Sequence, residues 1–280
     1  MKGLIVCADD FAINTSVSLG IAKLAQMGRL SATSAMVLSP RWARDAPRLQ
    51  DLRGQLDVGL HLDWTSDFAL AAGHGLPLAA AMRRALLGRF GQAQASTVLE
   101  RQLDAFESHW QAPPDFVDGH QHVQQFAGIR EALVATLQRR YGALGVKPYL
   151  RISRAPPGLA DIKSRVMAWM GANALASLAA AAGLRSASGL LGVYDFEGGP
   201  QRYAVLMTRW LARAPAGAIL MCHPAQAAEP DDAIGVARAQ EFAYLASADF
   251  AQALQDAGAS LARGTSLAPP LKSDGDKEPF

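Results

Sequence analysis

Residues 3–10 of this chain read GLIVCADD, an apolar run that ends in two adjacent aspartates. A short apolar run bounded by polar residues predicts a strand that is buried on both faces. A helix is expected next, from Thr15 to Met27, with Asn14 as its N-cap. The residues from position 8 to 14, ADDFAIN, lack the glycine-rich pattern of a dinucleotide-binding loop. A Rossmann-type cofactor site is therefore excluded.

The alternation of strand and helix continues along the chain. Further strands are predicted at residues 32–38, 57–62, 115–118, 149–152, 218–222 and 260–262. Helices are predicted after Pro40 and over residues 95–110, 129–141 and 237–256. Strands separated by helices form right-handed βαβ units and therefore a parallel sheet. About seven strands in this order favour an α/β fold of the TIM-like (β/α) barrel type over an open sheet.

The barrel is expected to be a single domain of residues 1–265, followed by a polar, flexible tail at residues 266–280. Two segments interrupt the regular alternation. Trp64–Gln94 contains several glycines and is interpreted as an excursion over the mouth of the barrel. Val166–Leu184 has no charged residue, but glycine and polar residues interrupt it. This favours a buried or half-buried helix over a transmembrane one.

Composition excludes several classes of protein. Lys and Arg number 27 against 25 Asp and Glu, a formal net charge of +2, and no dense basic cluster is present. Nucleic-acid binding and membrane binding are therefore not expected. The amino-terminal residues lack the pattern of a signal peptide, which predicts a cytoplasmic protein. Two cysteines in apolar runs indicate buried thiols. A 50% hydrophobic composition with few charges favours a homodimer.

Polar residues stand where the predicted strands end. These are Asp9 and Asp10 after the first strand, His61, the group Asp118, His120 and His122, then Arg151 and His223. The carboxyl ends of parallel strands converge on one face, where α/β proteins carry their sites. Any one of these residues is commonly a helix cap or a core residue. Four of the six histidines at strand ends, however, indicate a shared site.

The chemistry of this set suits a metal. One carboxylate and two imidazoles make a three-ligand site that leaves positions open for water and substrate. His120 and His122 are alternate residues, so both would face one side if the strand continued through them. A second carboxylate beside the ligands can accept a proton from water, and an imidazole across the pocket can protonate a leaving amine.

Five motifs in order, ADDF, SATSAMV, VGLHL, VDGHQHV and MCHPA, resemble those of the YdjC/ChbG-type carbohydrate deacetylases. The resemblance covers most of Met1–Ala225. It implies a distorted (β/α) barrel like that of polysaccharide deacetylases. It also implies a metal-dependent hydrolase that removes the acetyl group from N-acetylated sugars or oligosaccharides, with one divalent ion, Mg²⁺ or Zn²⁺, as its cofactor.

The resemblance also implies roles for single residues. Asp10, His61 and His120 match the metal ligands of the family. Asp9 matches the general base, and His223 the general acid or oxyanion stabiliser. Arg151 matches the arginine that holds this base ionised by pairing with it.

Sugar contacts are expected from His122, Gln124 and Trp64. Gln124 stands where the family often has a histidine, so it can bond a sugar hydroxyl but cannot titrate. Ala12 stands in the place of a glycine of the ADDFG pattern. If that position has a positive φ, alanine costs about 1 kcal/mol.

Two alternatives stay open from the residues alone. The same triad serves other hydrolases and, with iron, oxygenases. A non-catalytic sugar-binding barrel is the other alternative, because Gln124 would interrupt a proton relay through that position.

Overall fold

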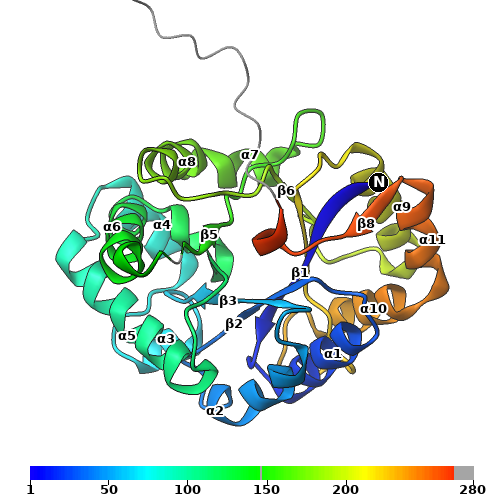
Figure 1. Cartoon of the computed structure of the whole chain (residues 1–280), viewed down its shortest axis with the longest axis horizontal. Coiled ribbons are helices and arrows are strands. Elements are labelled where there is room, and N and C mark those ends of the chain that lie inside the picture. Colours follow the sequence, from blue (N-terminus) through cyan, green and yellow to red (C-terminus); the bar gives the residue numbers. More distant parts are fainter. Residues whose placement is uncertain (146, 268–280) are drawn as a thin grey trace, which may run out of the picture.

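The computed structural model of the protein describes residues 1–145 and 147–267. Its centre is a curled sheet of eight strands, and every strand pair is parallel (Figure 1). Seven strands follow the order β5-β4-β3-β2-β1-β7-β6, and β8 pairs with the start of β1. The seven-strand path confirms the predicted α/β barrel class. The bounds are β1 (Lys2–Phe11), β2 (Ala32–Ala35), β3 (Asp57–Leu62), β4 (Phe116–Gly119), β5 (Tyr149–Leu150), β6 (Leu190–Leu191), β7 (Ile219–Cys222) and β8 (Ala259–Leu261).

The barrel is distorted where its two end strands meet. Strands β5 and β6 do not pair with each other along their length. Instead, the N–H of Leu150 donates to the carbonyl of Arg185 at 2.9 Å, and the N–H of Ala187 donates to that of Leu150 at 3.2 Å. This bridge joins β5 to the residues that precede β6, and the N–H of Leu190 in β6 also donates to the carbonyl of Arg154 at 2.9 Å.

Helices surround the sheet, as the alternation predicts (Figure 1). Asn14 caps the first of them, because its side-chain oxygen accepts the N–H of Val17 at 2.9 Å. The helices are α1 (Thr15–Gln26), α2 (Trp42–Asp45), α3 (Asp67–Ala71), α4 (Leu78–Leu86), α5 (Gln92–Trp110), α6 (Ile129–Tyr141), α7 (Ile162–Trp169), α8 (Ala172–Ala181), α9 (Gly199–Arg213), α10 (Gly235–Ala246) and α11 (Ala248–Asp256).

Three elements differ from the prediction. The helix expected over 237–256 is two helices, because Ser247 takes an extended conformation between α10 and α11. The charge-free stretch 166–184 also spans two helices, separated at Gly171, whose φ is 134°. A side chain there would meet the carbonyl oxygen of Gln125 at 2.2 Å, so glycine is required. Strand β6 is not predicted, since two leucines between glycines carry no periodicity.

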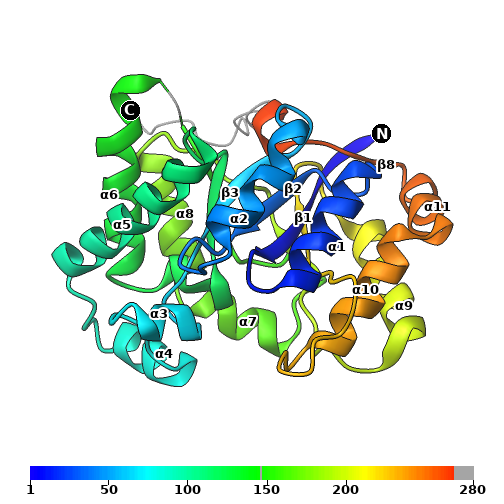
Figure 2. The same ribbon diagram turned by 90° about the horizontal axis from the view of Figure 1, so that it is seen from below.

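Segment 64–94 forms α3 and α4, which lie on the same side of the sheet as α7 (Figure 2). Leu78 and Met82 of α4 line the cavity described below, in agreement with an excursion over the barrel mouth. The tail expected at 266–280 lies outside the described residues from position 268 onward.

Apolar side chains of the strands and of the facing helices fill the interior. Cys7 and Cys222 are buried there as free thiols on neighbouring strands β1 and β7, as their apolar surroundings predict. Among the described residues, no helix combines the length and the apolar character needed to cross a membrane.

Candidate active site

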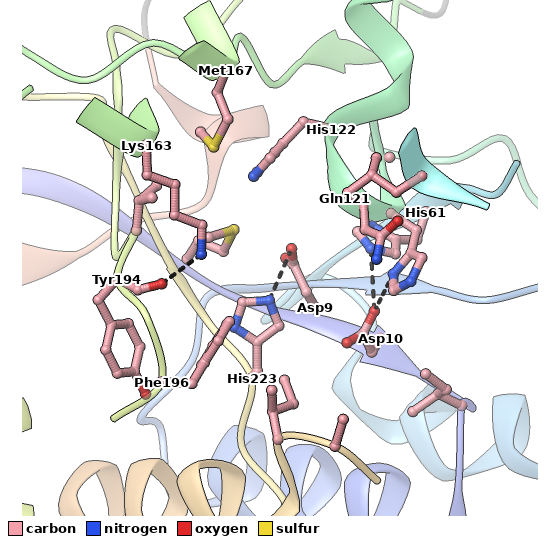
Figure 3. Close-up of a pocket in the computed structure, with 18 of the residues that line it drawn as sticks. Asp9, Asp10, His61, Gln121, His122, Lys163, Met167, Tyr194, Phe196 and His223 are labelled. Carbon is pink, nitrogen blue, oxygen red and sulfur yellow. Dashed lines mark hydrogen bonds and ion pairs between the residues drawn. The ribbon is translucent and has the colours of Figure 1, made fainter. Parts of the chain in front are cut away.

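A cavity of about 660 Å³ opens at the carboxyl ends of the strands. Six of the predicted site residues line it, and Figure 3 shows several of them converging on its centre. They are Asp9, Asp10, His61, His120, His122 and His223.

Both aspartates reach the cavity because β1 is irregular at its end. Adjacent residues of a regular strand point to opposite faces. Here the pairing of β1 with β2 shifts between Ala8 and Phe11, and Asp10 has a left-handed φ of 68°. The bulge turns the two neighbouring carboxylates toward the same space. Ala12, which stands in the place of the glycine of the ADDFG pattern, also has a positive φ, 74°.

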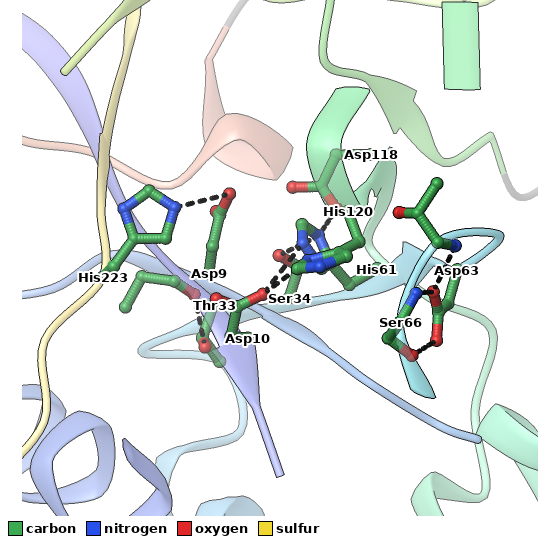
Figure 4. A network of polar contacts seen from close by, with 12 residues as sticks. Asp9, Asp10, Thr33, Ser34, His61, Asp63, Ser66, Asp118, His120 and His223 are labelled. Atoms are coloured by element: carbon green, nitrogen blue, oxygen red, sulfur yellow. Dashed lines mark hydrogen bonds and ion pairs between the residues drawn. The ribbon is translucent and has the colours of Figure 1, made fainter. Parts of the chain in front are cut away.

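Asp10, His61 and His120 form a compact cluster of possible metal ligands (Figure 4). The Oδ1 atom of Asp10 lies 3.3 Å from Nε2 of His61 and 3.1 Å from Nδ1 of His120. One donor atom from each residue lies within 4.8 Å of the others. A carboxylate oxygen and two imidazole nitrogens at this spacing fit around one divalent ion.

A second carboxylate fixes the ring of His61. The Nδ1–H of His61 donates to Asp118 Oδ1 at 2.6 Å, and Ser34 Oγ lies 3.0 Å from the same nitrogen. Burial opposes protonation of His61, but the carboxylates of Asp118 and Asp10 raise its pKa to about 10 in the metal-free protein. Nε2 is thereby directed at Asp10, as in sites where a carboxylate orients a metal-binding histidine.

Arg238, which the sequence does not predict, binds the other oxygen of Asp10. Its guanidinium donates to Asp10 Oδ2 at 2.7 Å and, through Nε, to Asp232 Oδ2 at 2.7 Å. Burial opposes ionisation of Asp10, but Arg238 and the two histidines lower its pKa well below the ordinary value. Arg238 thus keeps one carboxylate oxygen occupied and the other facing the histidines.

Asp9 is held by Arg151, which is itself fully buried. Nη1 of Arg151 donates to both oxygens of Asp9, at 2.7 and 2.9 Å, and lies 2.9 Å from Asp118 Oδ2. Burial opposes ionisation of Asp118, yet Arg151 and His61 lower its pKa. The carboxylates of Asp9 and Asp118 also lie near Cys7. Because the guanidinium already joins these carboxylates, they form an ion-pair network rather than a second metal site.

His223 and the cluster of Asp10, His61 and His120 lie on opposite sides of Asp9 (Figure 4). Nε2 of His223 is 3.9 Å from Asp9 Oδ2. Burial lowers the pKa of His223 to about 4, despite the carboxylates of Asp9 and Asp10. The neutral imidazole is therefore the stable form in the metal-free protein. Its backbone N–H donates to the carboxylate of Glu241 at 2.6 Å, and Glu241 also accepts the hydroxyl of Tyr194 at 2.7 Å.

The segment that carries His120 and His122 is a 3-10 turn, not a continuation of β4. Strand β4 ends at Gly119, and Gln121 and His122 both take left-handed conformations, with φ of 53° and 63°. The prediction that strand alternation places the two histidines on one side is therefore wrong, although both line the cavity. Burial lowers the pKa of His122 well below its ordinary value, and its Nδ1 lies 2.9 Å from Ser153 Oγ.

Gln124 and Trp64 are buried outside the cavity lining, which corrects their prediction as sugar contacts. The side-chain amide of Gln124 donates to the carbonyl of Arg151 and to Ser153 Oγ, both at 3.1 Å. It thus anchors the backbone of the arginine that binds Asp9. Trp64 packs edge-on against His74, with ring centroids 5.7 Å apart. Gln124 lies in the turn after β4 and Trp64 at the start of segment 64–94, and both side chains are buried in the protein interior.

The walls above the polar floor are mostly apolar, which the sequence does not predict. They come from α4, from α7 and its C-cap, and from the segment after β6: Leu78, Met82, Val166, Met167, Met170, Val193, Tyr194 and Phe196. Lys163 is the exception, and its ammonium group donates to the carbonyl of Tyr194 at 2.7 Å.

Arg238 and Glu241 were not predicted from the sequence. Their helical spacing, on a buried face of α10, is the one signal that could have indicated these two residues.

Two chitooligosaccharide deacetylases are among the curated proteins that are similar to this chain in sequence. Chitooligosaccharide deacetylase of Serratia marcescens is 32% identical over 136 residues, 44% of this chain and 50% of that protein. The enzyme of the same name from Proteus mirabilis (strain HI4320) is 30% identical over 137 residues, 45% of this chain and 51% of that protein. The alignments thus span about half the length of these curated relatives.

Solved structures share the fold. A proposed cellobiose-phosphate cleavage protein of Enterococcus faecalis V583 superposes with a TM-score of 0.69 at 20% identity, covering 95% of this chain and 99% of that one. The carbohydrate esterase domain of a xylanase, from the hindgut metagenome of Trinervitermes trinervoides, gives a TM-score of 0.51 at 9% identity, over 94% and 87%. The family model of YdjC-like proteins matches residues 3–256, and the chain therefore belongs to the YdjC-like family.

Proposed function

We propose that the protein is a metal-dependent hydrolase that removes the acetyl group from an N-acetylated sugar or oligosaccharide. The observation that carries this proposal is the position of Asp9, which is held by Arg151 beside the cluster of Asp10, His61 and His120. A base next to a three-ligand site is the arrangement that amide hydrolysis requires. The names of the curated relatives support the substrate class.

Asp10, His61 and His120 would hold the ion. The donor set fits, since Asp118 and Arg238 already orient His61 and Asp10 from outside. Two imidazoles and one carboxylate suit Zn²⁺ at least as well as Mg²⁺. When bound, such an ion acidifies water and polarises a carbonyl group.

Asp9 is the base in this proposal. It accepts a proton from the attacking water as the oxygen of that water bonds to the acetyl carbon. The C–N bond then breaks, and the proton on Asp9 passes to the departing amine, so that acetate and the free amino sugar leave. Arg151 donates to both oxygens of Asp9 and so holds this carboxyl group in place before the attack.

His223 donates a hydrogen bond to the oxyanion of the tetrahedral intermediate. A neutral imidazole can fill this role, and burial favours the neutral form by lowering the pKa to about 4. The alternative role of general acid would need a protonated ring, so we assign the proton transfer to Asp9.

The test is acetate release from a panel of N-acetylated mono- and oligosaccharides, with Zn²⁺ and Mg²⁺ supplied separately and oxygen excluded. Asp9→Asn should lower turnover by about 10³-fold while bound metal stays at the wild-type level. Sugar binding without acetate release, with either metal, would contradict the proposal and favour a non-catalytic barrel. Activity that requires iron and oxygen would indicate an oxygenase.

A further inference from the structure

Two helices at the rim of the cavity present apolar stripes to solvent. On α7, Ile162, Val166 and Trp169 follow the spacing of one helix face and are 83%, 44% and 70% exposed. On α4, Leu86 follows Met82 by one turn and is 56% exposed. Both stripes border the cavity, because Val166 and Met82 also line it. Such a stripe is normally buried against another element.

These stripes belong to a larger concentration of exposed apolar side chains. Eleven large apolar residues of the described chain are exposed, and six of them lie on α3, on α7, or on α4 and its C-cap: Leu70, Leu86, Leu87, Ile162, Val166 and Trp169. Figure 2 shows the three helices on the same side of the molecule. We call α4 and α7 the rim helices.

The rim helices are also basic and carry no acid. The sequence has no Asp or Glu between Asp67 and Glu100, and none between Asp161 and Asp195. The basic residues of these helices and their flanks are Arg83, Arg84, Arg89, Lys163 and Arg165, and the flank of α7 also carries one acid, its N-cap Asp161. Within the described part of the chain, none of these five forms an ion pair with a carboxylate. Three of them, Arg83, Arg84 and Arg89, surround a second cavity of about 420 Å³ together with leucine and alanine side chains.

We propose that the rim helices dock the mouth of the cavity onto the surface of an anionic lipid bilayer. Apolar side chains between basic ones form the pattern of a helix that lies in the membrane interface. The four arginines would pair with lipid phosphates while Trp169 and Leu86 enter the acyl boundary. This docking is peripheral, and it reverses the expectation from net charge, because the two rim helices themselves carry only basic charges and most of the acidic residues stand elsewhere in the chain.

A second copy of the chain is a weaker candidate for the same surface. A dimer through the rim helices would bury the same stripes, but it would bring the basic residues of one copy toward those of the other. Like charges oppose such a contact, whereas anionic lipid complements it. The apolar walls of the cavity, with Met167 and Phe196, continue the apolar character from the rim inward.

Trp169 makes the proposal directly measurable. Of the five tryptophans it alone is exposed, and the other four are at most 6% exposed. Its fluorescence should shift to the blue when vesicles of phosphatidylglycerol and phosphatidylcholine are added. Vesicles of phosphatidylcholine alone should give a much weaker shift, and about 0.5 M NaCl should reverse most of the binding. A blue shift that depends on protein concentration without lipid would indicate a second copy and overturn the proposal.

A matched pair of variants tests the location. The rim variant combines Arg165→Glu with Trp169→Ser. The control variant combines Lys147→Glu with Leu144→Ser, at exposed positions in the loop before β5, at the amino ends of the strands. Both variants change the charge equally, and each replaces one exposed apolar side chain with serine. In cosedimentation, the rim variant should bind anionic vesicles at least about tenfold more weakly, and the control should bind as wild type. Equal binding by the two variants would overturn the proposal.

Docking is separable from the proposed hydrolysis. Asp9→Asn should bind vesicles like the wild type, since Asp9 lies on the buried floor. Failure of vesicle binding would leave the deacetylase proposal untouched, and failure of acetate release would leave the docking result untouched.

Discussion

Asp9 and Arg151 stand 142 residues apart in the sequence, and in the fold their side chains meet at 2.7 Å, almost completely shielded from water. Arg151 also lies 2.9 Å from Asp118. One guanidinium therefore balances two buried carboxylates, and Asp118 in turn orients His61. The proposed base and the proposed metal ligands are linked through a single arginine.

Arg151→Met should destabilise the protein by about 3–5 kcal/mol, because it leaves two buried carboxylates without their partner. The free energy of unfolding in urea measures this loss. Arg151→Lys should recover part of it. Arg202→Met, which breaks an exposed pair with Asp195, serves as the control and should leave the urea midpoint unchanged. A similar midpoint for Arg151→Met and Arg202→Met would contradict the buried network.

Asp118→Asn should weaken metal binding by about 10–100-fold, because it removes the carboxylate that orients His61. Calorimetric titration of the metal-free protein with Zn²⁺ gives the affinity without reference to turnover. Asp115→Asn is the matched control. Asp115 stands just before β4, at the end of the strand away from the cavity, and accepts the N–H of Val58. If the two variants bind Zn²⁺ equally well, the orienting role is refuted.

Glu241→Gln should change how stability depends on pH. Burial raises the pKa of Glu241 from 4.5 to about 7, so the unfolded chain loses this proton before the folded protein does. The free energy of unfolding of the wild type should therefore fall, relative to that of the variant, as the pH rises from 4.5 to about 7. The expected change is on the order of 2–3 kcal/mol between about pH 5 and about pH 8. Urea unfolding across this range measures it, with the exposed Glu197→Gln as a control that should run parallel to wild type. A constant difference between Glu241→Gln and wild type would count against the buried ionisation.

Ala12→Gly should raise the free energy of unfolding by up to about 1 kcal/mol, because Ala12 has a φ of 74° and glycine adopts this conformation without strain. Ala22→Gly, in the middle of α1, should do the opposite by a similar amount. Thermal unfolding of the two variants gives the comparison. A loss of stability in Ala12→Gly would show that the alanine methyl group contributes more by packing than the backbone loses by strain.

Local signals in the sequence were sufficient for much of the fold. The apolar run before Asp9 predicts β1, and Asn14 predicts the start of α1, because strand burial and capping depend on neighbouring residues alone. Six residues of the cavity could also be predicted, because each follows a predicted strand and parallel strands place their carboxyl ends together.

What the sequence could not predict depends on backbone irregularities and distant contacts. Gln124 points away from the cavity because Gln121 and His122 turn left-handed, which no propensity indicates. Arg238 reaches Asp10 across 228 residues, so its role depends on how α10 packs. The basic and apolar surface of the rim helices was not predicted, because the net charge is a sum over the whole chain and does not show where the charges lie.

The left-handed residues around the cavity limit how the protein can be improved. Asp10, Ala12, Gln121 and His122 each take a conformation that glycine or asparagine adopts more easily. A directed-evolution experiment that screened only for heat resistance would favour such replacements at these positions. Ala12 could change without cost to the site, whereas replacing Asp10 would remove a proposed metal ligand. Libraries for thermostability should therefore hold position 10 fixed and screen for activity in parallel.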